Sequence, residues 1–420
     1  MTPDRFRWVY CQLDNLRRCM PSSIRKSLNE LPVTLDETYE RTLQCIPKQK
    51  CQHAHRLFQC LVAAIRPLRV QELAEIFAIE FASNVALGLV EDWRPEDPEE
   101  AVLSACSTLI SIIIDANGSK IVQFSHFSVK EFLTSDRLQT TEVENVRQYY
   151  VPLEPAHTLL AQACLTVLLQ LDENVDKTRL ETFALAIYAA EHWVDHAKFQ
   201  NVVSQIQDTM EQLFNPMKPH FRAWIWIHNM DPWSSSPNFN KCSSPPQPDL
   251  TSLYYAALCG FSGLAKRLIV AHAEDVNAKC CASARSTPLH AASLRGHVDV
   301  VHMLLDHGAD VHVQKDGRMT PLHIASNHGH LKVVQFLLKH EVAIDAISGV
   351  DGWTPLYHAS SHGHLEVVRL LLDHGADANI KGTYGTPFQV ATRVGHHDVA
   401  RLLQNHLAQL NRRVQKVQNE

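Results

Sequence analysis

The chain has 420 residues, a formal net charge of −6, and a composition of 45% hydrophobic and 20% charged residues. This length predicts two or three domains, each with enough apolar residues to form a core. The acidic balance disfavours a general binder of nucleic acid or of membrane surfaces, because such proteins are normally basic. The apolar stretches are shorter than a membrane span, and the first residues lack the pattern of a signal peptide. The 11 cysteines show no framework spacing, so we expect free thiols and a cytoplasmic protein, with the nucleus as the alternative.

The first region, residues 1–137, has the pattern of a winged helix. Two segments show apolar residues at helical spacing, and two later β-type runs flank Asn117-Gly118, a pair that favours a hairpin turn. The expected elements are helices at 53–65 and 70–79 and strands at 109–114 and 120–124. Helix, turn, helix and hairpin in this order define a winged-helix-like domain.

Two motifs in this region carry a family resemblance. They are Leu31–Arg41 (LPVTLDETYER) and Ser125–Leu133 (SHFSVKEFL). The region resembles the part that follows the nucleotide-binding domain in fungal NACHT–ankyrin proteins, which are relatives of NOD-like receptors. The resemblance implies a signalling protein in which an NTPase acts as a switch and the repeats sense a ligand. It also places His126 where a sensor histidine would touch nucleotide phosphates, although Phe127 replaces an acidic neighbour. The alternative for His126 is a structural histidine under the wing.

The NTPase core itself is missing from this sequence. A phosphate-binding loop needs G-x-x-x-x-G-K-[ST], whose glycine amides hold phosphate oxygens, and the first glycine of the chain is Gly88. The dinucleotide motif G-x-G-x-x-G and the nucleophile motif G-x-S-x-G are absent as well. We therefore expect no catalytic residues, no cofactor and no enzyme activity. Whether a truncated gene or a short protein explains the missing NTPase is left open.

A helical connecting segment is predicted over 138–230, followed by a Pro/Ser-rich linker at 231–248. Expected helices cover 154–171, 181–199, 202–214 and 221–230. His192 and His196 stand at i and i+4 on one of them, which is a spacing used by metal ligands. Asp195 is expected to point off that face, so we predict no metal site.

Ankyrin repeats are predicted over 249–410, with a polar tail at 411–420. Thr-Pro pairs recur at Thr287, Thr320, Thr354 and Thr386, and 33, 34 and 32 residues separate them. This period and the T-P-L-H-x-A pattern are those of ankyrin repeats, and we expect about five of them. Threonine suits the helix N-cap and proline the first helical position. Glu341 stands where other repeats have glycine, so that turn is either strained or rearranged.

The function of such an array lies on its concave face, formed by hairpin tips and the exposed side of each first helix. The residues expected there, and the ones expected to bind a protein partner, are Leu294, Arg295, Arg318, Met319, Asn327, His328, Trp353, Ser361, His362, Tyr384, Arg393 and Val394. Aromatic residues and arginine are enriched in binding hot spots. For Trp353 the alternative is packing against the neighbouring hairpin.

The sequence thus predicts a mainly α protein with a winged-helix-like N-terminal domain, a helical connecting segment and a C-terminal ankyrin-repeat solenoid. The first hypothesis is a non-catalytic scaffold that binds protein through the ankyrin concave face. The second is a regulatory fragment that associates with a NACHT-bearing chain. A DNA-binding winged helix is disfavoured, because its expected reading helix, 70–79, carries Glu72 and Glu75, which would repel phosphate. The identity of the partner, the pathway and the oligomeric state are not predicted.

Overall fold

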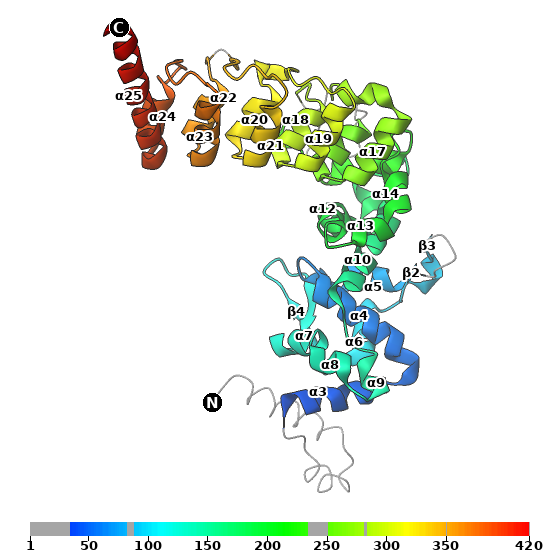
Figure 1. Ribbon diagram of the computed structural model, residues 1–420. Helices are drawn as coiled ribbons and strands as arrows, with labels where there is room; N and C mark the ends of the chain where they lie inside the picture. Colours follow the sequence, from blue (N-terminus) through cyan, green and yellow to red (C-terminus); the bar gives the residue numbers. More distant parts are fainter. Residues whose placement is uncertain (1–33, 82–87, 234–250, 281–283, 350, 420) are drawn as a thin grey trace, which may run out of the picture. The chain divides into compact units, whose positions relative to one another are not determined.

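The computed structural model describes residues 34–81, 88–233, 251–280, 284–349 and 351–419. Expectations that fall on 1–33 and on most of the linker lie outside these residues. The chain divides into two compact units, one formed by Met1–Leu213 with Ala223–His228 and the other by Phe214–Arg222 with Asn229–Glu420 (Figure 1). Helices dominate both units, and strands occur only in the first among the described residues.

The winged-helix expectation for the first unit is confirmed. Its elements are α3 Leu35–Gln44, α4 Cys51–Ala63, β1 Leu68–Arg69, α5 Val70–Phe77, β2 Ile79–Glu80, β3 Gly88–Leu89, α6 Pro98–Cys106, β4 Ile110–Ile114, β5 Lys120–Phe124 and α7 Phe127–Leu133. Two short 3₁₀ turns, Lys48–Lys50 and Glu91–Trp93, lie between them. Strands β1, β5 and β4 form an antiparallel sheet in that order, with Ile112 opposite Val122.

The wing turns where the Asn117-Gly118 pair predicts. Gly118 has a φ of 80°, and the Asp115 carboxylate accepts hydrogen bonds from the amides of Asn117 and Ser119, both at 2.8 Å. Such a side-chain acceptor at the start of a turn replaces a backbone partner. The hairpin is therefore specified by its own local sequence.

Buried carboxylates hold helix α5 in place. Glu72, which is 1% exposed, accepts two hydrogen bonds from Arg66 at 2.7 and 2.9 Å and one from the Arg69 amide at 2.7 Å. Glu75 accepts from Arg94 at 2.8 Å and from the Leu185 amide at 2.6 Å. Burial raises the pKa of Glu75, opposed by these two donors. Since an unpaired buried charge is costly, these donors fix both carboxylates, and Glu75 joins α5 to the connecting segment at Leu185.

The connecting segment is helical, as expected, but more divided. It comprises α8 Asp136–Thr140, α9 Glu144–Arg147, α10 Leu153–Leu168, α11 Lys177–Leu180, α12 Ala186–Ala197, α13 Val202–Gln205, α14 Gln207–Leu213 and α15 Pro219–Ile227. The stretch expected as one helix over 202–214 is broken between α13 and α14. Trp193 and Trp224 meet edge to face at 5.2 Å, and the Trp224 indole donates to the Ala190 carbonyl at 3.1 Å.

Five helix pairs form the second unit and confirm the ankyrin repeats. They are α16 Ser252–Cys259 with α17 Ser262–Ala271, α18 Pro288–Arg295 with α19 Val298–Asp306, α20 Pro321–Asn327 with α21 Leu331–Leu337, α22 Pro355–Ser361 with α23 Leu365–Asp373, and α24 Pro387–Val394 with α25 His397–Asn419. Short 3₁₀ turns occur at Ala273–Asn277 and Asp316–Arg318. Helix α25 continues through most of the segment expected as a polar tail.

Threonine and proline begin four of the first helices as predicted. In α20, for example, Thr320 caps the helix by accepting from the His323 amide at 3.5 Å, and Pro321 takes the first position. Glu341 retains the left-handed turn with a φ of 50°, so of the two expectations for this position the strained one holds.

Candidate protein-binding surface

The two motifs of the N-terminal region meet in space. The Tyr39 hydroxyl lies 2.8 Å from the Ser128 hydroxyl, and Ser128 lies 2.6 Å from Nδ1 of His126. The same Nδ1 accepts a hydrogen bond from the Ser128 amide at 3.3 Å and so caps α7. Arg137 adds ion pairs to Asp36 and Glu40 at 3.0 Å. His126 thus has a structural role at a helix start, which is the alternative stated for it above.

The helix expected to read DNA does not lie at the surface. In α5 every residue except Gln71 is buried, because both faces pack in the domain. The helix that directly precedes the wing is α6, which the sequence reading missed. Its first turn carries Glu99 and Glu100 behind the capping Asp97. Carboxylates at this end would repel phosphate, so neither helix provides a DNA-reading face.

Of the two histidines of α12, His196 takes part in a buried chain of hydrogen bonds. The Ile65 amide donates to the Tyr188 hydroxyl at 3.2 Å, and that hydroxyl lies 2.9 Å from His196 Nε2. His196 Nδ1 in turn lies 2.9 Å from His157 Nδ1. Burial lowers the pKa of His196 to about 3, and His157 and His192 add to this shift. The neutral ring therefore serves packing.

His192 turns to the acidic side chains beside it. Its Nδ1 lies 3.5 Å from Oδ2 of Asp195. The Asp195 carboxylate is therefore close to His192, whereas we expected it to point away from the helix face that carries the two histidines. No group of three or more histidine, cysteine or acidic residues within the described parts of the chain is arranged to hold a metal ion.

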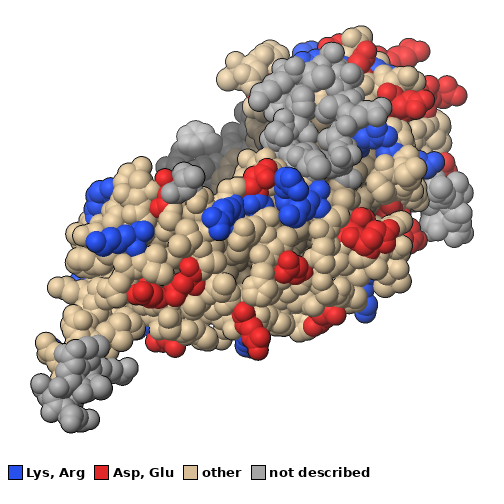
Figure 2. Space-filling model, turned by 90° about the horizontal axis from the view of Figure 1, so that it is seen from above, with Lys and Arg blue, Asp and Glu red and all other residues tan. Residues whose placement is uncertain are grey.

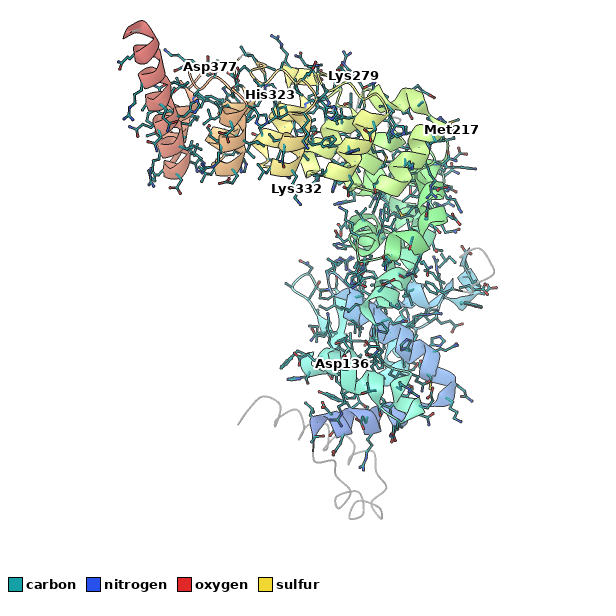
Figure 3. The ribbon with its side chains drawn as sticks, viewed as in Figure 1. Asp136, Met217, Lys279, His323, Lys332 and Asp377 are labelled. Atoms are coloured by element: carbon teal, nitrogen blue, oxygen red, sulfur yellow. The ribbon has the colours of Figure 1, made fainter. Side chains whose placement is uncertain are left out.

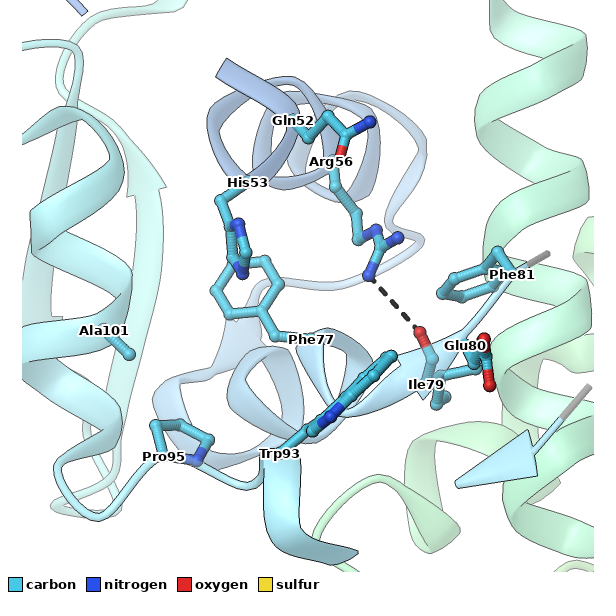
Figure 4. A pocket seen from close by; sticks show the side chains of 10 residues that line it. All are labelled: Gln52, His53, Arg56, Phe77, Ile79, Glu80, Phe81, Trp93, Pro95 and Ala101. Carbon is cyan, nitrogen blue, oxygen red and sulfur yellow. Dashed lines mark hydrogen bonds between the residues drawn. The ribbon is translucent and has the colours of Figure 1, made fainter. Parts of the chain in front are cut away.

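A cavity of about 700 Å³ lies in the winged-helix unit beside α4 and α5 (Figure 4). Its lining includes the rings of His53, Phe77, Phe81 and Trp93. Arg56 donates to the Ile79 carbonyl at 3.4 Å and lies over Phe81, 4.7 Å from the ring centre. Burial and Arg56 both lower the pKa of His53. The walls are thus mainly aromatic, and their polar groups are partly engaged with each other.

The residues predicted to bind a partner differ in their exposure. Seven are exposed, namely Arg295, Arg318, His328, His362, Tyr384, Arg393 and Val394; four are half-buried, namely Met319, Asn327, Trp353 and Ser361. Leu294 is 5% exposed and belongs to the core between repeats, so it offers nothing to a partner. Repeat alignment did not predict that Leu294 is buried, because the equivalent residues Asn327, Ser361 and Arg393 in later repeats are polar.

Trp353 packs on its neighbours. Its ring stacks on Tyr357 at 5.4 Å with an interplanar angle of 16°, and Tyr384 of the next hairpin lies 6.4 Å away. This is the packing alternative named for Trp353. Tyr384, in contrast, is 55% exposed, and Arg393 covers its ring at 4.3 Å. The Tyr384–Arg393 pair therefore presents both hot-spot residue types to solvent.

The ends of the first helices carry basic side chains in register. Arg295, His328 and His362 occupy the position before the terminal glycine in three successive repeats. Burial lowers the pKa of His328, and His330, His362, His364 and Arg295 lower it further. On the side of the repeat row seen in Figure 2, Lys and Arg side chains form a broken line with Asp and Glu side chains beside it. Because the pKa of His328 is lowered, the fixed positive charge at these helix ends is that of Arg295, which an acidic group of a partner would complement.

Two contacts on this surface were not predicted from the sequence. Arg295 donates to the Met230 carbonyl at 2.8 Å, and the ammonium of Lys315 lies 4.1 Å from the ring centre of Trp233. Residues 229–233 therefore lie on the first repeats. Only the Trp in an otherwise Pro/Ser-rich stretch could have signalled this.

Two family profiles match the chain. Ankyrin repeats match at residues 233–315, 253–348, 310–382 and 341–414, and the winged-helix domain of GPI inositol-deacylase matches at 21–143. The chain thus contains ankyrin repeats and an N-terminal winged helix domain of the GPI inositol-deacylase type. Among the described helices, none combines the length and apolarity needed to cross a membrane.

Curated relatives add a further comparison. The chain is 32% identical over 295 residues to "Azaphilone pigments biosynthesis cluster protein L" of Monascus ruber, an alignment that covers 68% of this chain and 61% of that protein. It is 37% identical over 82 residues to "Alpha-latrocrustotoxin-Lt1a" of Latrodectus tredecimguttatus, covering 20% of this chain and 5% of the toxin. The chain therefore spans less than two thirds of the length of either relative.

Proposed function

We propose that this protein is a non-catalytic, cytoplasmic scaffold that binds a protein partner through the concave face of its ankyrin array. The observation that carries the proposal is the exposed Tyr384–Arg393 pair, together with the exposed Arg318 of an earlier hairpin and the exposed His328 and His362 at two first-helix ends. Exposed arginine and tyrosine in a concave surface are the residue types on which binding energy concentrates. We also propose the domain boundaries of this scaffold. They are a winged-helix-like domain at 1–137, a helical connecting segment at 138–230, a linker at 231–248, ankyrin repeats at 249–410 and a tail at 411–420.

The test is capture of a partner by the full chain carrying Tyr384→Ala and Arg393→Ala. The matched control carries Lys332→Ala and Arg369→Ala, which are exposed residues of the second helices. Lys332 and Lys279 lie on opposite edges of the repeat row (Figure 3). We expect a captured protein whose affinity falls about tenfold or more with the first variant and is unchanged with the control. Equal losses in both variants would contradict the proposal.

A second candidate function is a regulatory fragment of NACHT-type signalling. The contact of Tyr39 with Ser128 supports it, because this contact joins the two motifs on which the family resemblance rests. In this function the chain would pair with a NACHT-bearing chain in the same cells. Co-expression followed by size-exclusion chromatography tests this directly: a stable complex that keeps the two chains together is expected, and separate elution would remove this candidate.

A further inference from the structure

The first repeats carry a short segment of the chain itself on their surface. Residues Asn229–Trp233 lie outside the repeats, yet each of three anchor points touches a different repeat or hairpin. The Met230 sulfur lies 3.4 Å from the Cys259 sulfur at the end of α16. The Met230 carbonyl accepts from Arg295 at the end of α18, at 2.8 Å. The Trp233 ring then lies under Lys315 of the following hairpin.

The segment is shaped for this position by its own hydrogen bonds. The Asn229 side chain accepts from the Asp231 amide at 3.0 Å, and the Asp231 carboxylate accepts from the Trp233 amide at 2.9 Å. Two such side-chain turns in succession bend the backbone around Pro232. Asp231 is only 5% exposed, so the bend presses its acidic side chain onto the protein surface.

Lys315 shows that the contact is a complementary one. The side chain is 9% exposed, although it stands in a hairpin where lysine is normally solvated. Burial lowers its pKa, whereas the carboxylates of Asp231 and Asp316 raise it. A buried ammonium needs such compensation, and the ring of Trp233 and the charge of Asp231 provide it. The surface therefore recognises an aromatic ring with an acidic group two residues before it.

We infer that Asn229–Trp233 is an intramolecular ligand of the first part of the concave face, and that this part fits a short acidic-aromatic peptide segment. The inference rests on the proposed function, because it names what occupies one end of the same binding face. A partner that presents an acidic residue and an aromatic ring displaces the segment and takes over Arg295 and Lys315. Since Tyr384 and Arg393 lie in the last repeat, the other end of the face stays open for a first encounter.

The test uses a fluorescein-labelled peptide that copies residues 228–235 and the full chain, with fluorescence anisotropy as the readout. A tethered segment competes at an effective concentration of about a millimolar, so the wild type should bind the peptide weakly. Trp233→Ala with Asp231→Asn weakens the internal segment and leaves the face intact, and we expect about tenfold tighter binding or more. Trp233→Phe keeps a ring and should behave as the wild type.

Adding Lys315→Ala and Arg295→Ala to the displaced variant should abolish the gain. Equal peptide affinity in wild type and displaced variant, or a gain that survives removal of Lys315 and Arg295, would overturn the inference. Thermal melting followed by circular dichroism verifies that each variant is folded.

A second measurement needs no variant. Acylation of lysines in the native wild type should modify Lys315 at least about tenfold more slowly than the exposed Lys332, because the reagent reaches the amine beneath Trp233 only when the segment opens locally. Equal rates would overturn the inference. The capture experiment with Tyr384 and Arg393 tests the proposed function independently of these peptide and acylation measurements. The inference about Asn229–Trp233 and the proposed function can therefore be contradicted separately.

Discussion

Arg318 holds a backbone conformation that glycine adopts without strain. Its φ is 57°, and the residue at the equivalent position of the next hairpin is Gly352 with a φ of 70°. Both residues stand two positions before the threonine that caps the first helix. A left-handed non-glycine residue costs about 1 kcal/mol, and such strain persists where the side chain is useful. A change at Arg318 should therefore affect the stability of the repeats and the binding of a partner in opposite directions.

Replacing Arg318 by glycine should stabilise the repeats and weaken partner binding. Relief of the left-handed strain should raise the free energy of unfolding by about 0.5–1 kcal/mol, measured by urea denaturation. The partner, captured as above, should bind less tightly because the guanidinium is lost. Arg318→Ala is the matched control, since it removes the same side chain but keeps the strain. A fall in stability with Arg318→Gly would show that the arginine side chain contributes to packing.

At the scale of elements, a histidine in each of the last four repeats forms a hydrogen bond to the end of the first helix of the preceding repeat. Nε2 of His297, His330, His364 and His396 lies 3.2, 2.8, 3.0 and 3.2 Å from a carbonyl of the preceding first helix. The rings lie directly on glycines with left-handed backbones. A Cβ on Gly329, for example, would come within 2.5 Å of Nδ1 of His364. These positions need glycine for two reasons, the left-handed backbone and the lack of space for a Cβ. The glycines that end the second helices, Gly308 and Gly375, need it only for the left-handed backbone.

Gly329→Ala should therefore destabilise more than Gly308→Ala. At Gly308 the φ is 84° and nothing lies within 4 Å of an added Cβ, so alanine should cost about 1 kcal/mol. At Gly329 the clash with the His364 ring adds an overpacking cost of about 1–3 kcal/mol. Urea denaturation measures both variants. The double change Gly329→Ala with His364→Ala should recover part of the extra loss, and equal costs at Gly308 and Gly329 would contradict the expected clash with His364.

These elements also show which parts of the structure the sequence could predict. The Thr-Pro caps and the Asn117-Gly118 turn were legible because each depends on neighbours within a few residues. Helix α6 was missed, although Asp97 before Pro98 is a start signal, because its nine residues have no clear apolar stripe. The position of Trp233 under Lys315 joins residues far apart in sequence. No local sequence pattern encodes such a contact. The contact nevertheless determines which part of the concave face is covered by the chain itself.

At the scale of the whole molecule, the described parts of the two units differ in how many fully buried histidines have a pKa of about 3–4. His196 lies in the first unit, whereas His290, His323 and His358 lie in the repeats. Burial is the main cause that lowers the pKa to about 3 for His196, His290 and His358 and to about 4 for His323. In His323 the ring Nδ1 accepts from the Thr320 amide at 3.2 Å while Nε2 donates to the Ala346 carbonyl at 2.9 Å. That arrangement needs the neutral ring.

Acid should consequently destabilise the repeats more steeply than the first unit. The folded pKa of each histidine lies below the unfolded value of 6.5, so its stabilising effect is complete above pH 6.5 and is lost as the pH falls toward 3–4. Between the folded and the unfolded pKa each ring contributes a slope of about 1.4 kcal/mol per pH unit, and three rings together contribute about 4 kcal/mol per pH unit. Calorimetry of the full chain between pH 7 and pH 5 should show the repeat transition moving further than the other.

His323→Gln provides the matched control for this acid dependence. The last repeat already has Gln389 at the equivalent position, where its side chain accepts from the Thr386 amide at 2.9 Å. The exchange should therefore preserve the helix cap while removing one titrating ring. We expect the pH slope of the repeat transition to fall by about 1.4 kcal/mol per pH unit. An unchanged slope would mean that His323 is already protonated in the folded repeats, in which case the Thr320 amide has lost its acceptor.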